Sequence, residues 1–166
     1  MSLIKRLIFS QKLLCYLLSL LVCSYSNLSF ANPICTITAT GPSAIYDPLG
    51  GVDAVAAGNI QTNCIYVGLG STTLAYQIAL SPGVSNTYNN RTMRFLSNSL
   101  TYNFYTNASY SLVWGNGTGG TSVVVDSYTM TAGTVIKNYS VYMRIPRAQS
   151  INAGSYTDSI TVTVTY

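Results

Sequence analysis

The sequence predicts an all-β protein, a β-sandwich of short antiparallel strands with one disulfide. Apolar and polar residues alternate in several short runs, and Gly, Pro and Asn stand between these runs. Thr, Ser, Asn, Gly and Tyr are abundant, whereas charged residues make up only 7% of the chain, which is typical of exported β-proteins. The alternation, the composition and a pair of cysteines together predict this fold class.

The first 31 residues have the pattern of a secretory signal peptide. Three cations precede an apolar run at residues 13–22, and Ser29-Phe30-Ala31 supplies the small residues that a signal peptidase recognises. The apolar run is too short to span a bilayer, which argues against a membrane anchor. We therefore expect an exported chain in which residues 32–166 form a single domain.

Eight runs in the mature part are expected to form strands, and turn signals lie between them. Loops are expected at Ser81-Pro82-Gly83, at Asn89-Asn90 and over the glycine-rich residues 115–120. No amphipathic helix of useful length follows residue 31. The expected strands are residues 34–40, 59–66, 74–80, 92–95, 100–105, 122–130, 140–145 and 156–166.

Two cysteines, Cys35 and Cys64, remain after removal of the signal peptide, and we expect them to form a disulfide. Closing a loop of about 30 residues stabilises a fold by about 3 to 4 kcal/mol in the chain-entropy model. A two-cysteine metal site is the alternative, but the sequence contains no His to complete it.

The last run is the clearest strand and the least protected one. Ile160, Val162, Val164 and Tyr166 lie on one side of its alternation, and Thr residues lie on the other. Strand edges are normally blunted by charge, Pro or a bulge, yet this run carries only Asp158, near its start. If these four side chains stayed half-exposed, the fold would lose about 6 to 12 kcal/mol of the free energy gained by burying them. A whole domain is stable by only about 5 to 15 kcal/mol.

The charge pattern argues against a nucleic-acid partner. The mature part carries five cations and four Asp, a net charge of about +1. Nucleic-acid binding proteins present a dense basic patch with interleaved aromatic residues, and five scattered cations do not form one. The basic character of the whole chain comes mostly from the signal peptide.

Catalysis and metal binding find little support in the sequence. The chain has no His, and its only acidic residues are four scattered Asp, so the usual general base and the commonest metal ligand are missing. The glycine-rich residues 115–120 lack the Lys-Ser/Thr ending and the following helix of a phosphate loop, so a hairpin loop is expected there. We expect no enzyme activity, no cofactor and no metal.

Three stretches share their order and spacing with one protein family. The first runs from Cys35 through IYDPLG at 45–50 and Gly58-Asn59-Ile60 to Cys64. The second is LTYNFYTNASYSLVWGNGTGGT at 100–121, and the third is AGSYTDSITVTVTY at 153–166. Together they resemble the spore coat protein U domain family, which includes subunits of Csu-type archaic chaperone-usher pili, over essentially the whole mature chain.

The resemblance implies an immunoglobulin-like sandwich that lacks its last strand. A periplasmic chaperone would supply a strand first, and another pilin subunit would supply it later during assembly at an outer-membrane usher. It implies export through the periplasm to a surface pilus of a Gram-negative bacterium, with roles in adhesion and biofilm formation. The groove for the added strand would be lined by Ile37, Ile160, Val162, Val164 and Tyr166, and the carboxylate of Tyr166 would bind basic chaperone residues.

One feature departs from the usual shaft subunit of such a pilus. Only Asn32-Pro33-Ile34 precede Cys35 in the expected mature chain, whereas shaft subunits carry a longer alternating apolar extension that serves as the donor strand. Pro33 cannot donate a ladder hydrogen bond. We therefore expect a subunit that accepts a strand but donates one poorly, as a minor or tip-proximal subunit would.

Three alternatives stay open at this point. The terminal strand could pair internally and complete an ordinary sandwich. The protein could be a freestanding secreted coat or matrix protein. It could also be a lectin-like surface-binding module that uses its aromatic side chains. For that module, Trp114 is a candidate for recognition and also for core packing, and the candidate tyrosines are Tyr102, Tyr105 and Tyr110, with Tyr139 and Tyr142 as further members.

Overall fold

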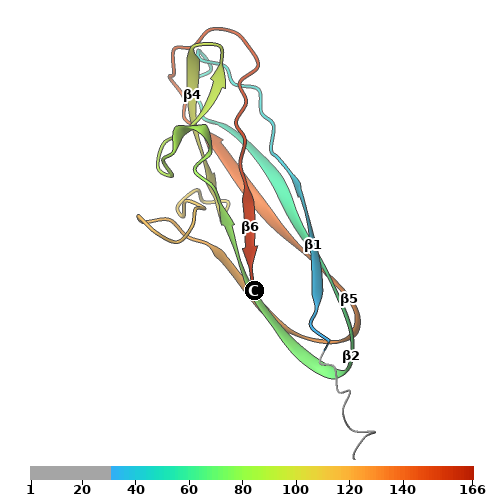
Figure 1. The fold of residues 1–166 in the computed structure, drawn as a ribbon. Helices are drawn as coiled ribbons and strands as arrows, with labels where there is room; N and C mark the ends of the chain where they lie inside the picture. Colours follow the sequence, from blue (N-terminus) through green and yellow to red (C-terminus); the bar gives the residue numbers. More distant parts are fainter. Residues whose placement is uncertain (1–30) are drawn as a thin grey trace, which may run out of the picture. The chain divides into compact units, whose positions relative to one another are not determined.

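The computed structural model describes residues 31–166, in which residues 32–166 form one compact unit. The expected signal peptide therefore lies, except for Ala31, outside the described residues. No helix in the described part is long and apolar enough to cross a membrane. The elements, shown in Figure 1, are β1 (Ile34–Thr40), β2 (Ala54–Leu80), the 3-10 turn η1 (Gly83–Ser85), β3 (Arg91–Phe95), β4 (Asn98–Tyr105), β5 (Val124–Ile145) and β6 (Val162–Thr165).

A long antiparallel ribbon of β2 and β5 organises the sheet. The strand order is β1-β2-β5-β4-β3, and β6 also pairs with β2. The β2–β5 register runs from Ala54 opposite Ile145 to Ile78 opposite Val124 and shifts between Tyr66 and Ser71. Gly133 lies opposite Tyr66 at this shift with a φ of 141°, a conformation that L side chains rarely adopt. Both strands bend at this place (Figure 1).

Because of the bend, the two halves of the ribbon face each other. The hydroxyls of Thr62, in the first half of β2, and Tyr76, in the second half, are hydrogen-bonded at 3.1 Å. Alternate residues of both halves, among them Ile60, Cys64, Ile78 and Met130, are fully buried or nearly so and form the core. The two layers of the expected sandwich are thus two halves of one curled sheet, and the prediction of an all-β fold is confirmed.

The strand boundaries differ from the sequence-based ones in two respects. The expected strands at 59–66 and 74–80 form one continuous β2, and those at 122–130 and 140–145 form one β5, because pairing resumes just after the bend. The expected final strand at 156–166 is shorter, since β6 covers only Val162–Thr165. The residues before β6 form no continuous strand, and their backbone pairs only at single places, as in the isolated bridge between Thr157 and Arg94 of β3.

The disulfide between Cys35 and Cys64 is present, which confirms the sequence-based prediction. The two residues lie directly opposite each other in the β1–β2 ladder. β1 pairs with no described strand other than β2, so this ladder and the disulfide are its attachment to the sheet.

We predict that the double substitution Cys35→Ser/Cys64→Ser lowers the free energy of unfolding by about 2 to 5 kcal/mol, because the unfolded chain loses its cross-link. Urea unfolding of the mature domain measures this difference. As a control, dithiothreitol should shift the unfolding midpoint of the parent and leave that of the double variant unchanged. A double variant as stable as the oxidised parent would contradict a structural role for the bond.

Candidate functional site

A hollow of about 530 Å³ opens between the end of β1 and the segment that leads into β6. Residues 39–43 line one side of it and residues 155–162 line the other. Its floor consists of core side chains, which are Ile60, Leu80, Met93, Tyr102, Phe104, Val141 and Met143. The interior of the sandwich is therefore accessible from this side.

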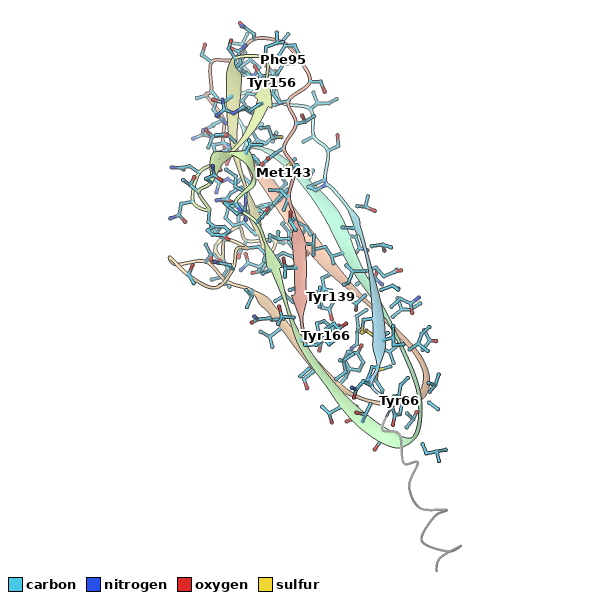
Figure 2. The ribbon with its side chains drawn as sticks, in the orientation of Figure 1. Tyr66, Phe95, Tyr139, Met143, Tyr156 and Tyr166 are labelled. Atoms are coloured by element: carbon cyan, nitrogen blue, oxygen red, sulfur yellow. A yellow bond between two sulfur atoms is a disulfide. The ribbon has the colours of Figure 1, made fainter. Side chains whose placement is uncertain are left out.

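A second hollow of about 750 Å³ continues the first one toward the loop at residues 42–48. Both hollows share Pro42, Met93, Met143 and Tyr156, so together they form one trough, called the groove below. At this end of the groove Tyr156 packs against Phe95, with ring centroids 5.7 Å apart (Figure 2). Apolar side chains thus form much of the groove's lining along its length, and polar residues such as Thr40, Ser155 and Asp158 lie among them.

Both strands that flank the groove have one unpaired edge. Among residues 31–166, β1 and β6 each pair only with β2, and they do so at different places along it. Figure 1 shows them on the same side of the ribbon. Their outer backbone N–H and C=O groups have no strand partner, so each edge can pair with a further extended chain.

The strand registers show which side chains point inward beside the groove. Ile37 lies opposite Thr62, which is buried, yet 41% of Ile37 is exposed. Val162 and Val164 lie opposite the buried Leu80 and Ile78 and are themselves only half-buried. Inward-facing apolar side chains are therefore partly exposed on both flanking strands, which indicates a core that lacks a cover there.

The structure places three of the five expected groove residues, Ile37, Val162 and Val164, on these two strands, while Ile160 precedes β6 and Tyr166 follows it. Not all five lie in the groove. Ile160 and Val162 line the first hollow. Ile37 and Val164 lie on the inward faces of β1 and β6 without lining either hollow. Tyr166 follows the last paired residue of β6 and is 68% exposed. Their role in binding a strand remains a prediction.

Two of the six aromatic candidates for surface recognition, Trp114 and Tyr102, are buried, so that interpretation is wrong for them, whereas Tyr139 and Tyr142 are half-buried. Trp114 is fully buried, and its Nε1 donates a 2.9 Å hydrogen bond to the carbonyl of Ile78. Tyr102 is 2% exposed and lies on the groove floor. Tyr105 and Tyr110 are half-buried and contact each other edge to face, and their role in recognition remains a prediction.

Arg91 is a fully buried arginine behind the groove, and its position was not expected from the sequence. Its guanidinium donates to the carbonyl of Ser81 at 2.8 and 3.1 Å, to the carbonyl of Trp114 at 2.8 Å and to Oδ1 of Asn103 at 2.7 Å. The guanidinium also lies over the ring of Phe104, 5.7 Å from its centroid. Burial lowers the pKa of Arg91, but an arginine remains charged at neutral pH.

Asp158 fixes the segment that forms one wall of the groove. Its Oδ2 accepts a 2.7 Å hydrogen bond from the hydroxyl of Tyr102, and its Oδ1 accepts from the backbone N–H groups of Val84 and Ser159 at 3.0 and 2.7 Å. Gly83 precedes Val84 with a φ of 70°, and any side chain there would collide with the Asp158 carboxylate. The wall is thus held by side-chain hydrogen bonds and by the single bridge of Thr157 to β3, rather than by a continuous strand ladder.

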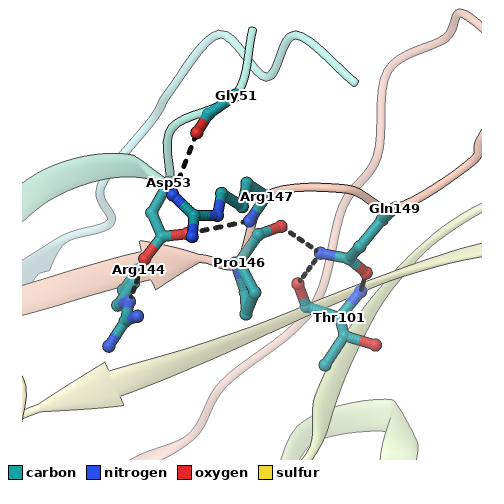
Figure 3. A network of polar contacts seen from close by, with 7 residues as sticks. All are labelled: Gly51, Asp53, Thr101, Arg144, Pro146, Arg147 and Gln149. Atoms are coloured by element: carbon teal, nitrogen blue, oxygen red, sulfur yellow. Dashed lines mark hydrogen bonds and ion pairs between the residues drawn. The ribbon is translucent and has the colours of Figure 1, made fainter. Parts of the chain in front are cut away.

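A second polar network holds the chain after β5, beyond the far end of the groove (Figure 3). Asp53 accepts from Arg144 Nε at 2.6 Å and from the backbone N–H of Arg147 at 2.9 Å. The Arg147 backbone bond and the Arg144 side chain lower the pKa of Asp53. Gln149 binds both backbone groups of Thr101, at 2.8 and 2.9 Å. These contacts tie residues 146–149 to β4 and to the start of β2.

The described residues offer no cluster of three or more His, Cys, Asp or Glu that could hold a metal ion. The arrangement around the groove provides apolar hollows and unpaired strand edges. Such a site can bind an extended chain, because main-chain hydrogen bonds give affinity and alternate side chains fill the hollows.

Comparison with known families places this geometry in context. The family model of the Spore Coat Protein U domain matches residues 22–163. The chain belongs to this family. Among functionally characterised proteins, none matches the sequence significantly.

Two solved structures match the chain, and the first of them shares its fold. One is the CsuC–CsuE chaperone–tip adhesion subunit pre-assembly complex from archaic chaperone-usher Csu pili of Acinetobacter baumannii, with 22% identity, a TM-score of 0.53, and coverage of 81% of this chain and 40% of that one. The other is a chaperone–tip adhesin complex of CFA/I fimbriae, with 12% identity, a TM-score of 0.42, and coverage of 79% and 42%. The chain thus spans less than half of each matched chain.

We predict that Arg91→Met lowers the free energy of unfolding by about 2 to 4 kcal/mol, because the substitution leaves buried carbonyl groups without donors. Arg94→Met is the matched control in the same strand. Since Arg94 is exposed, its substitution should change stability by less than about 0.5 kcal/mol. Urea unfolding of both variants tests this, and equal effects would contradict the role assigned to Arg91.

We predict that the domain loses stability as the pH rises above about 10 and that Tyr102→Phe reduces this loss. Burial and then the hydrogen bond to Asp158 raise the pKa of Tyr102 above its ordinary value near 10. The folded state therefore favours the neutral phenol, and its contribution is full below pH 10 and is lost above it. Urea unfolding between pH 8 and 11.5 measures the slopes, and identical slopes for parent and variant would contradict this assignment.

Proposed function

We propose that this protein is a structural subunit of a chaperone-usher surface pilus and that it accepts an extended strand from a partner between β1 and β6. The observation that carries the proposal is the apolar groove, which lies between two strands that each have an unpaired edge. Membership of the spore coat protein U domain family supports it. So does the similarity in fold to a subunit that was solved together with its chaperone.

The geometry favours a strand over a small ligand. An extended chain places successive side chains on opposite faces, so every second residue would enter the hollows while the others face solvent. Its backbone would pair with the free edges of β1 and β6, as neighbouring strands do in a sheet. Ile37, Ile160, Val162, Val164 and Tyr166 would then lie against the added strand and lose their partial exposure.

The partners follow from this role. A periplasmic chaperone occupies the groove first, and a neighbouring pilin subunit replaces it at the outer-membrane usher. Tyr166, which directly follows β6, is 68% exposed and therefore accessible to side chains of the chaperone. Export through the periplasm to a pilus on the cell surface is part of the proposal, as are adhesion and biofilm formation. The function is association rather than catalysis.

A synthetic strand of ten alternating valine and threonine residues tests the groove directly. We expect it to raise the urea midpoint of the isolated domain, because it covers the partly exposed apolar side chains. Ala39→Asp should weaken binding at least tenfold, since Ala39 lines the groove and a charge there would be buried by the strand.

Thr38→Asp is the matched control for this experiment. Thr38 is the neighbouring residue of β1 and lies on its other face, so the same charge there should change binding less than twofold. Ala39 and Thr38 are both exposed, so neither substitution disturbs core packing. Equal binding by the two variants, or an absent effect of the peptide on the parent, would overturn the proposed function in favour of a freestanding secreted protein.

A further inference from the structure

The sandwich has a second long unpaired edge, on the side opposite to the groove. β4 pairs with β5 only at Arg144, Met143 and Tyr142. The rest of β5, residues 124–141, pairs with β2 on one side, and no strand within residues 31–166 covers its other side. This edge is longer than the free edges of β1 or β6, so by length alone it is the better template for strand addition.

The outer surface of this edge does not protect it. Val125 is 69% exposed and Ile136 is 54% exposed, and both point away from the core. An exposed edge with apolar side chains normally promotes association. The residues that face inward along the same edge must therefore supply whatever protection the edge has.

The inward side of this edge carries a chain of hydrogen bonds that joins the two halves of the ribbon. The Tyr139 hydroxyl, from the second half of β5, donates to Asp126 Oδ2, in the first half, at 2.6 Å. The hydroxyls of Tyr139 and Tyr76 are hydrogen-bonded, and Tyr76 reaches Thr62 at 3.1 Å. Figure 2 labels Tyr139 between the two halves of the sheet. These hydrogen bonds thus connect the two layers of the sandwich along the β5 edge.

Lys137 forms an ion pair with Asp126 at the same edge. Its Nζ lies 3.9 Å from Asp126 Oδ2 and 5.0 Å from the ring centroid of Tyr128, both in the opposite half of the ribbon. Lys137 lies opposite the buried Thr62 in the β2–β5 register, so it belongs to the inward face of β5. Two opposite charges therefore face the interior of the sandwich at this edge.

The strands that flank the groove have the opposite chemistry. Asp158 also lines the groove, but it belongs to the wall segment before β6 and is already bonded to Tyr102 and to two backbone N–H groups. Besides Cys35 in the disulfide, the inward-facing residues of the two strands are Ile37, Ala39, Val162 and Val164, all of them apolar. A strand that inserts its apolar side chains there gains burial and breaks no side-chain hydrogen bond of these four residues. At the β5 edge the same strand would have to break the Tyr139–Asp126 bond and bury Asp126 and Lys137 against apolar groups, which is unfavourable because both charges would lose polar contacts.

We propose that Tyr76, Asp126, Lys137 and Tyr139 form a polar seal that closes the β5 edge to strand addition and so directs an incoming strand to the groove between β1 and β6. This inference rests on the proposed function, because it explains which of the two free edges of the domain an incoming strand binds. Inward-pointing charges are a known means by which proteins protect free edges. The polar seal determines specificity and does not contact the strand bound in the groove.

The test is the number of Val-Thr strand peptides, of the ten-residue design above, that bind per chain. The variant Asp126→Leu/Lys137→Leu/Tyr139→Phe removes the polar seal and retains side-chain bulk. We expect the parent to bind one peptide and the variant to bind two, or to self-associate in sedimentation velocity through the newly apolar edge. A folded variant that stays monomeric and binds one peptide would overturn the inference, as would a parent that binds two.

Ser127→Leu/Ser140→Leu is the matched control. Both serines lie on β5, are exposed and face outward, so these substitutions add apolar surface to the edge without touching the polar seal. This variant should bind one peptide and remain monomeric. Two peptides or self-association here would show that general hydrophobicity, not the polar seal, decides the outcome, and would also overturn the inference.

A measurement on the parent alone keeps the inference testable should the triple variant fail to fold. The Val-Thr peptide should slow hydrogen exchange at the free-edge amides of β1 and β6 and leave exchange at the free-edge amides of residues 126–139 unchanged. Slowed exchange along 126–139 would contradict the polar seal. A peptide that slows no amide at all would instead contradict the proposed function, so the two failures are distinguishable.

Discussion

β1 and β6 are both bonded to β2, at different places along one edge of it, and in the described chain neither has a second strand partner. Much of the remaining structure depends on this constraint. The bend in the β2–β5 ribbon brings its two halves face to face, and the inward-facing Ile37, Val162 and Val164 stay partly exposed beside the groove. In the function proposed above, the groove is the space that an added strand occupies.

An incomplete core must be held open by contacts that do not come from strand pairing. Arg91 binds the carbonyl groups of Ser81 and Trp114 behind the groove, and Asp158 holds the wall that leads to β6. On the opposite side Tyr139 and Asp126 join the two layers. Buried polar groups with all their partners specify one arrangement more strictly than apolar contacts do, because each lost partner is costly. The groove therefore has rigid surroundings although it lacks a cover.

The sequence predicted the parts of this account that depend on local pattern. The all-β class, the disulfide and the inward side of the final strand follow from period-two alternation and from two cysteines in an exported chain. The continuity of β2 and β5 could not be seen, because glycines around residues 68–70 and at 133 give the same signal for a bend as for a turn between strands. Their pairing across the bend is a tertiary property.

The buried polar residues could not be predicted from the sequence for a different reason. Arg91 looks like any other isolated cation, and its partners Ser81, Asn103 and Trp114 lie in three separate segments of the chain. Tyr102 and Trp114 were surface candidates only by residue type, while their burial depends on the register of β4 and on the path of the loop after it. Asp126 and Lys137 are 11 positions apart in the sequence, and only the bend in β5 brings them together as an ion pair between the two layers.

Amide hydrogen exchange of the isolated domain tests the uncovered core most directly. The account predicts that amides of β1 and β6 which do not bond to β2 exchange nearly as fast as in an unfolded peptide, whereas those bonded to β2 are protected. Adding the strand peptide should then slow the fast set. Slow exchange at every amide of β1 and β6 in the isolated domain would contradict the account, because both edges would already be paired.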